Sequence, residues 1–477
     1  MGERPLWQWS AVELSDAIRA GRLSAREAVA AAVERMRAQN PRLNAVVDDL
    51  GEAALARAEA LDRELRLNGP LGPLHGVPVT VKENVDQKGR PTPNGVAAFK
   101  EVIAPDDSPV VRNLERAGAV VIGRTNTPEF SLRATTDNPL HGRTLNPWHP
   151  ELSPGGSSGG ASAAVMAGMG AIAHGNDIAG SLRYPALATG AATVKPGLGR
   201  VPAYNPSAKV ERGLLAQIMS VQGVIAREVR DVRLAMEALI AWDPRDPWMV
   251  AMPLEGPRPE PPIRVAFTQN PFEFTLHPAV ERALLRARDA LGDAGYLVEE
   301  AEPPDVREVG REALRCLLGE VRVLMEPDIR RYGSATMNAV LDTYYRLFEP
   351  YEGEALIHAM ARRAHHLRRW RLFLERYPLL LTPLLPQVPR YRWDRDRQGE
   401  EGVREVLGAG FYIASMNFLG LPAGVVAADR DGEGLPVAVQ LVAARFREDL
   451  ILDALEAIER RVGVMAEHLF AREASDR

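Results

Sequence analysis

The sequence predicts an α/β protein with one large, mixed but mostly parallel central sheet that helices cover on both faces. Helix-like and strand-like segments alternate along most of the chain, which is typical of parallel sheets with covering helices. The strand-like segments are short, apolar and β-branched, as in Val77-Pro-Val-Thr-Val-Lys82. The chain of 477 residues is 46% hydrophobic, which is ordinary for a globular protein and excludes a disordered one.

Residues 1–68 are predicted to be an N-terminal helical segment packed on the main body. Ser10-x-x-Glu13 and Ser24-x-x-Glu27 are capping boxes, in which both side chains satisfy free N–H groups at a helix start. A third helix, rich in Ala, Leu and Glu, is expected at 51–66.

From residue 77 onward the two kinds of element alternate. Strands are expected at 77–82, 119–122, 171–174, 263–267, 296–300, 378–382, 423–428 and 436–443. Helices are expected at 109–117, 161–170, 221–240, 277–293, 410–419 and 447–460. We therefore expect a single domain over 1–477, with the Pro-rich stretch 253–262 as its best candidate for a linker.

Residues 305–376 interrupt the alternation, because they are almost continuously helical in character and heavily charged. We expect them to form a helical insert within the same α/β body. Their basic run, Arg362 to Arg371, has acidic residues close by. The run therefore indicates a solvated face or a contact between copies of the chain, as in a homodimer.

The charge balance argues against two classes of partner. The 58 Lys and Arg residues against 63 Asp and Glu residues give a net charge of −5, which is unfavourable for binding nucleic acid or an anionic membrane. No apolar run approaches the roughly 20 residues of a membrane span. The start, Met1 to Trp7, lacks the apolar core of a signal peptide, so we expect a cytoplasmic protein.

The residue types that commonly bind metals are sparse or scattered. Cys316 is the only cysteine, and its leucine neighbours indicate a buried, inert thiol. The nine histidines form no cluster with the spacing of metal ligands. No metal site is expected.

The segment 152–201 is dense in Gly, Ser and Ala. Gly155–Gly160 precedes a helix of small residues, and free N–H groups at such a helix start suit an anion or an oxyanion. The loop lacks both the Lys-Ser/Thr pair of a phosphate loop and the glycine spacing of a dinucleotide fingerprint. His174 follows without an Asp-His-Ser order or a nucleophile elbow. By itself, this segment leaves a flexible turn and an anion site open.

A series of short segments carries a more specific signal when they are taken in order. They are Gly76–Asn84, Gly123–Phe130, Asn146–Trp148, Ser153–Gly160, Asp177–Arg183, Lys195–Arg200, Asn417–Ala423 and Leu435–Gln440. Together they resemble the amidase signature family, a large group of serine hydrolases, and the resemblance implies the family's α/β fold. It fades over 244–262 and 305–376, which makes 305–376 a variable insert in a region where substrate choice is usually made.

The resemblance implies a Ser–cis-Ser–Lys triad. Lys82, at the end of its strand, matches the base; Ser157, after a cis peptide with Gly156, matches the middle serine; Ser181 matches the nucleophile. A serine needs a base to take its proton, and a lysine can do so only when it is neutral, which requires burial that lowers its pKa. A hydroxyl can relay the proton because it accepts one hydrogen bond and donates another.

The resemblance also implies an oxyanion hole made by the backbone N–H groups of Ile178, Ala179, Gly180 and Ser181. The commoner family pattern has glycine where Ala179 stands. Alanine is strained only if its φ is positive. We expect an ordinary φ and therefore no penalty.

Four more side chains are assigned supporting roles by the resemblance. Ser131 matches a position whose backbone lines the family's substrate channel. Ser158 either hydrogen-bonds within the triad or shapes the loop. Asp177 and Arg183 are expected to hold the turn rigid.

These residues together predict an amidase that hydrolyses a carboxylic amide through an acyl-enzyme on Ser181. The expected partner is a small-molecule amide substrate, and no metal or organic cofactor is required. One alternative is the amidase subunit of a glutamine-dependent tRNA amidotransferase, which Ala179 and the insert disfavour. A binding protein on an inactive scaffold is disfavoured by the intact triad. Carbamate, ester and aryl-amide substrates stay open.

Overall fold

A single eleven-stranded sheet runs through residues 4–475, the part of the chain that the computed structural model describes. The strand order is β1-β3-β2-β4-β6-β5-β10-β11-β9-β7-β8. The strands are β1 (Val46–Asp49), β2 (Pro78–Lys82), β3 (Val120–Thr125), β4 (Ile172–Asp177), β5 (Ala192–Lys195), β6 (Val221–Ala226), β7 (Arg264–Phe267), β8 (Leu297–Glu300), β9 (Leu379–Thr382), β10 (Ala423–Arg430) and β11 (Pro436–Ala443). The predicted large mixed sheet is confirmed.

The prediction that this sheet is mostly parallel is wrong. Parallel pairing is confined to β3-β2-β4 near one edge and β9-β7-β8 at the other. The remaining six pairs, which include the whole centre of the sheet, are antiparallel. Residues 221–226, predicted as the start of a helix, form β6 between β4 and β5, and the short connection 431–435 returns β10 directly into β11. Neither β5 nor β6 was predicted as a strand, and both lie antiparallel to their neighbours at the centre of the sheet, while the β10–β11 hairpin reverses the chain direction without a covering helix.

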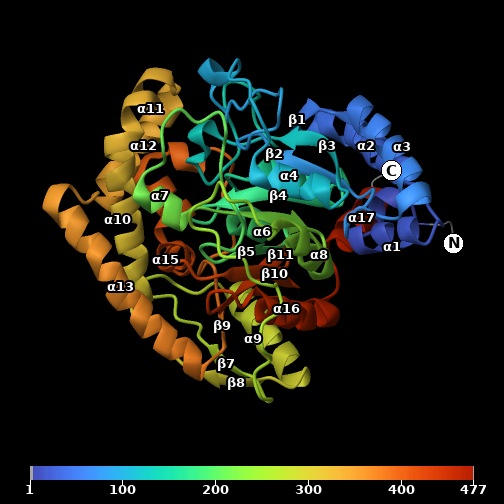
Figure 1. The fold of residues 1–477 in the computed structure, drawn as a ribbon. Helices are drawn as coiled ribbons and strands as arrows, with labels where there is room; N and C mark the ends of the chain where they lie inside the picture. The colour runs from blue at the N-terminus through green and yellow to red at the C-terminus, as the bar shows by residue number, and fades with distance from the viewer. Residues whose placement is uncertain (1–3, 476–477) are drawn as a thin grey trace.

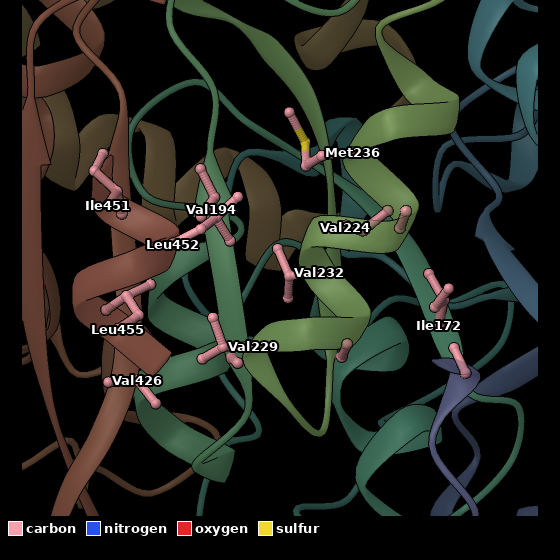
Figure 2. Packing of buried hydrophobic residues seen from close by; sticks show 14 of the residues in the cluster. Ile172, Val194, Val224, Val229, Val232, Met236, Val426, Ile451, Leu452 and Leu455 are labelled. Carbon is pink, nitrogen blue, oxygen red and sulfur yellow. The ribbon is translucent and has the colours of Figure 1, made fainter. Parts of the chain in front are cut away.

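Helices cover both faces of the sheet, as predicted. One face carries α1 (Ala11–Arg19), α4 (Pro109–Arg116), α8 (Val229–Leu239), α9 (Pro278–Asp293) and α16 (Glu448–Val462). The other face carries α2 (Ala25–Leu43), α3 (Gly51–Asn68), α5 (Gly159–Met166), α6 (Arg183–Thr189) and α15 (Phe411–Leu419). Figure 2 shows how the first face is sealed: apolar side chains of α8 and α16 pack against Ile172, Val194, Val224 and Val426 of the strands.

The remaining helices are added at the periphery. They are α7 (Leu214–Met219), α10 (Val306–Leu324), α11 (Glu326–Tyr332), α12 (Ala335–Phe348), α13 (Gly353–Arg376), α14 (Gly399–Val403) and α17 (Met465–Ser475), with short 3₁₀ turns at Leu6–Gln8, Ala97–Phe99, Glu129–Ser131 and Arg395–Arg397 and a π turn at Arg404–Gly408. Helices α10–α13 occupy the predicted insert and lie on the opposite side of the molecule from α1–α3 and both termini (Figure 1).

The N-terminal segment differs from its prediction in one respect. Both capping boxes form, at the starts of α1 and α2. The segment is not purely helical, however, because β1 pairs with β3 at the edge of the sheet and so joins the segment to the main body. The predicted lack of a signal peptide concerns Met1–Trp7, of which residues 1–3 lie outside the described part of the chain.

Two predictions about side chains outside the sheet can also be compared with the structure. The basic run on α13 faces acidic partners on and beside α10, because Arg362 contacts Glu312 and Arg369 contacts Asp305. Cys316 is buried, and burial raises the pKa of its thiol to about 12, as expected for an inert thiol.

None of the described helices is long and apolar enough to cross a membrane.

Candidate active site

Lys82 is completely buried at the carboxyl end of β2. Val79 and Val81 belong to the core on the face that carries α1, α4 and α8, so the alternation of the strand turns Lys82 toward the opposite face. Burial lowers the pKa of the Lys82 ammonium from 10.5 to about 7, although Asp177 and Glu83 act in the other direction. A substantial fraction of this lysine is therefore neutral near neutral pH.

Ser157 comes from the glycine-rich loop that precedes α5. The Gly156–Ser157 peptide is cis, as the resemblance implies. Gly156 has to be glycine, because a Cβ there would lie 2.6 Å from both the Arg133 carbonyl oxygen and the Thr135 nitrogen. The loop brings Ser157 Oγ to 2.8 Å from Lys82 Nζ, so the sequence-predicted base and middle serine meet.

Two further oxygens lie within hydrogen-bond distance of Lys82 Nζ. Ser158 Oγ lies 3.1 Å away, so the first of its two predicted roles, a hydrogen bond to the triad, is the one observed. Asn176 Oδ1 lies 2.9 Å away, and sequence reasoning did not identify this residue. The only available signal for Asn176 was its position, immediately before the matched segment that starts at Asp177.

Ser181 follows the turn after β4, just before α6. Its side chain and that of Ser157 lie on the wall of one cavity of about 930 Å³. That volume is at the upper end of the roughly 300–1,000 Å³ typical of small-molecule sites. The loop of Ser157 is tied to this turn, because the Ser158 N–H donates to the Ser181 carbonyl oxygen at 3.2 Å. The three residues matched to the triad thus converge at one place.

The turn 178–181 has one N–H group fewer for an oxyanion than predicted. The Gly180 N–H donates to Asp177 Oδ1 at 2.7 Å and is therefore already engaged. The N–H groups of Ile178, Ala179 and Ser181 have no acceptor among the described residues. Ala179 is absent from the residues with positive φ, whereas Gly180 has a φ of 116°, so the expected ordinary conformation of Ala179 is confirmed.

Asp177 and Arg183 hold this turn in place. Both side chains are fully buried and form a two-point ion pair, with nitrogen–oxygen distances of 3.0 and 3.1 Å. The ion pair and the Gly180 N–H lower the pKa of Asp177 to about 2, against the effect of burial. Gln440 Oε1 accepts from the remaining guanidinium nitrogen, Nη1, and Asn417 Oδ1 accepts from Nη2, which also donates to Asp177. The predicted rigid support is therefore present.

Ser131 lies on the cavity wall, as the resemblance implies. Ser131 and Phe130 have backbone φ values of 57° and 55°, which residues other than glycine rarely adopt. The Ser131 hydroxyl donates to Asn94 Oδ1 at 2.6 Å and accepts from Asn84 Nδ2 at 3.0 Å. These hydrogen bonds stabilise the unusual turn at the edge of the site.

His174 is unsuited to be the base. It is fully buried, and burial lowers the pKa of its imidazole to about 4. Its Nδ1 accepts from the Lys82 backbone N–H at 3.4 Å, and its Nε2 lies 3.0 Å from Gln222 Oε1. Both ring nitrogens thus have structural partners.

The rest of the cavity wall combines aromatic, aliphatic and polar residues. Phe99, Phe130, Tyr204 and Trp248 supply aromatic surface. Leu317 and Val321 come from α10, so the insert forms part of the wall. Glu320 of the same helix accepts from the N–H groups of Leu215 and Ala216, both at 2.8 Å, and so fixes α7 beside the cavity.

A buried lysine beside a serine, with a second serine on the same cavity wall, is typical of serine hydrolases that use lysine in place of histidine. The family model of Amidase matches residues 27–452. The chain belongs to the amidase signature family and is an amidase, an enzyme that hydrolyses the C–N bond of carboxylic amides.

Comparison with individual proteins agrees with this assignment. The chain is 51% identical to an indoleacetamide hydrolase of Bradyrhizobium diazoefficiens, over 98% of this chain and 89% of that protein. It is 29% identical to a subunit of the glutamyl-tRNA(Gln) amidotransferase of Synechococcus, over 97% and 98% of the two chains. Among solved structures, a 6-aminohexanoate cyclic dimer hydrolase with bound substrate superimposes with a TM-score of 0.82 at 27% identity, covering 97% and 98%.

Proposed function

We propose that this amidase hydrolyses the primary amide of an arylacetic acid, of the indole-3-acetamide kind, through an acyl-enzyme on Ser181. The observation that carries the choice of substrate is the 51% identity to an indoleacetamide hydrolase over nearly the whole chain. The aromatic side chains of Phe130, Tyr204 and Trp248 on the cavity wall support it, because flat rings pack well against one another.

Acylation begins when Ser181 Oγ attacks the amide carbonyl carbon. Its proton passes to Ser157, whose own proton passes to the neutral Lys82 amine 2.8 Å away. The oxyanion is stabilised by the free N–H groups of the turn 178–181. Lys82 then returns a proton through Ser157 to the leaving nitrogen, the C–N bond breaks, and ammonia departs.

Deacylation repeats the same proton transfers with water. Lys82 and Ser157 take a proton from the water as it attacks the ester carbonyl of acylated Ser181. The tetrahedral intermediate collapses, the C–O bond to Ser181 breaks, and the serine oxygen recovers its proton through the relay. The products are the carboxylic acid and ammonia, and the enzyme is regenerated.

A hydrolysis screen tests the proposed substrate class. Indole-3-acetamide and phenylacetamide should have a kcat/KM at least about tenfold above those of short aliphatic amides, peptide amides and carbamates, because only the former fill the aromatic wall. Faster hydrolysis of aliphatic or peptide amides would contradict the substrate but leave the amidase activity intact. Esters and anilides belong in the same screen, since acyl transfer to Ser181 is common to all of them.

The amidotransferase alternative makes a different prediction for the same protein. Such a subunit would release ammonia from glutamine mainly in the presence of its partners. We propose a stand-alone enzyme, because the identity to the indoleacetamide hydrolase far exceeds that to the amidotransferase subunit. The proposal includes a cytoplasmic location, a homodimer and no nucleic-acid partner. Glutamine hydrolysis that requires a copurified partner would overturn it.

A further inference from the structure

The three oxygens around Lys82 Nζ differ in what they can donate and accept. Asn176 Oδ1 is a carbonyl oxygen, so it can only accept, at 2.9 Å. Ser158 Oγ donates its own proton to the backbone carbonyl oxygen of Asn176 at 3.3 Å. It therefore accepts a hydrogen bond from Nζ at 3.1 Å. Ser157 Oγ, at 2.8 Å, is the partner that can either accept or donate.

A neutral lysine amine has two N–H donors and one lone pair. When Asn176 and Ser158 take the two N–H groups, the lone pair is left facing Ser157. The Ser157 hydroxyl then donates to Nζ, which is the direction needed to remove a proton from the nucleophile through the relay. Without the Asn176 acceptor, Nζ could donate to Ser157 and its lone pair would be misdirected.

The orientation of the Asn176 amide is itself fixed. Its Nδ2 donates to Asn84 Oδ1 at 2.9 Å, so its oxygen must face Lys82. Asn84 in turn donates from Nδ2 to Ser131 Oγ at 3.0 Å. A continuous set of hydrogen bonds therefore joins the unusual turn at Ser131 to the amine of Lys82.

We infer that Asn176, held by Asn84, is a positioning residue that turns the lone pair of the neutral Lys82 amine toward Ser157. This inference rests on the proposed function, in which Lys82 is the base. The other charged or titratable groups around Lys82 are Glu83 next to it in the chain and Asp177 and His174 on β4. Asp177 is paired with Arg183, and His174 contacts Lys82 only through the Lys82 backbone N–H. Neither Asp177 nor His174 therefore directs the amine.

The decisive measurement is the pH dependence of kcat/KM for Asn176→Asp, which preserves size but places a carboxylate on Nζ. The carboxylate stabilises the ammonium form. We expect the midpoint of the alkaline rise to move up by about one pH unit or more, with activity recovering at high pH. Gln217→Glu adds the same charge to the cavity wall, where its hydrogen-bond partners are Arg212 and Trp248 and not members of the Lys82 network, and should shift the midpoint less.

Asn176→Ala tests orientation without adding charge. We expect kcat to fall at least about tenfold at every pH with KM little changed, and Asn176→Thr to recover part of the loss because its hydroxyl can accept. Asn84→Ala, which frees the Asn176 amide to turn, should reduce kcat in the same way and remains informative if Asn176 variants fail to fold. Thermal unfolding of each variant separates these effects from loss of the fold.

Two outcomes distinguish this inference from the proposed function. If Asn176→Asp keeps the wild-type midpoint and rate while Lys82→Ala is inactive, Asn176 does not position the base, and the triad stands. If Lys82→Ala retains activity, Lys82 is not the base, and the proposed mechanism fails together with the inference.

Discussion

At the scale of single residues, the chemistry depends on the charge state of Lys82. Two carboxylates, Asp177 and Glu83, favour its ammonium form, yet burial dominates and lowers the pKa to about 7. The reason is that both carboxylates have closer partners. Asp177 is paired with Arg183, while Glu83 accepts from the Gly95 N–H and contacts His141. Lys82 itself is surrounded by neutral oxygens.

This environment predicts the pH dependence of the reaction. Activity should rise with pH through about 7, where Lys82 loses its proton, and then reach a plateau, because the base works only when neutral. Lys82→Arg should be nearly as damaging as Lys82→Ala, with a loss of at least about a hundredfold in kcat/KM, because a guanidinium does not deprotonate in proteins. An arginine variant with most of the wild-type rate would show that Lys82 supplies only charge.

Ser181 is the second residue whose substitution is diagnostic. Ser181→Ala should abolish turnover because no nucleophile remains, while the fold is preserved, since alanine fits a serine site. Hydrolysis assays together with circular dichroism and thermal unfolding check both parts. Retention of activity within a few fold of wild type would remove Ser181 from the mechanism.

At the scale of elements, the turn between β4 and α6 is defined by its supports. The Asp177 carboxylate accepts from the N–H groups of Gly180 and Leu182 and pairs with Arg183 at the start of α6. Gly180 adopts a φ of 116°, and a Cβ there would collide with the ring of Tyr184. The turn therefore tolerates alanine at 179 and requires glycine at 180.

A pair of neighbouring substitutions tests this local requirement. Gly180→Ala should cost about a hundredfold in kcat, because the added methyl group moves the N–H groups that face the oxyanion. Ala179→Gly should change kcat little, since Ala179 already has an ordinary φ. Steady-state kinetics of both variants on one amide provide the measurement. Equal losses in the two would contradict the assigned geometry of the turn.

At the scale of the whole molecule, carboxylates join helices that are distant in the sequence. Asp231 of α8 accepts from the N–H groups of Ala11 and Val12 at the start of α1. Glu459 of α16 accepts from the Val229 N–H at the start of α8. Burial raises the pKa of Asp231 to about 7 and that of Glu459 to about 8, and nearby Glu228 adds to both shifts.

These raised pKa values predict that part of the stability is lost as the pH rises. A carboxyl group with a higher pKa in the folded chain favours folding while protonated, and that contribution disappears as the pH rises through the folded-state pKa. For Asp231 the loss runs from about pH 4 to about pH 7. The free energy of unfolding of Asp231→Asn should therefore decrease less between about pH 5 and about pH 8 than that of the wild type, by on the order of 1 kcal/mol.

Urea denaturation of the wild type and Asp231→Asn at the two pH values measures this difference. An equal decrease in the free energy of unfolding in both proteins would show that the titration of Asp231 does not cause it. Titrating groups that do not interact with Asp231 contribute equally to the two curves, whereas Glu459, whose pKa the Asp231 carboxylate helps to raise, adds to the difference.

Much of this protein could be predicted from local sequence. The capping boxes at Ser10 and Ser24, the strand that ends at Lys82 and most of the helices follow from patterns that neighbouring residues create by themselves. The residues of the proposed triad could be named because their types and spacing match the family's segments. Their convergence beside one cavity agrees with that assignment.

Strand direction and the finer contacts of the site were decided only by the tertiary structure. Whether β6 is a strand, and antiparallel to β4, depends on pairs such as Asp177 with Val221, which are far apart in the sequence. Likewise, Asn176 and Ser158 meet Lys82 only once β2, β4 and the loop before α5 are packed together. Local propensity determines which segments become elements, whereas directional hydrogen bonds between distant segments determine how those elements pair and which polar groups remain free for catalysis.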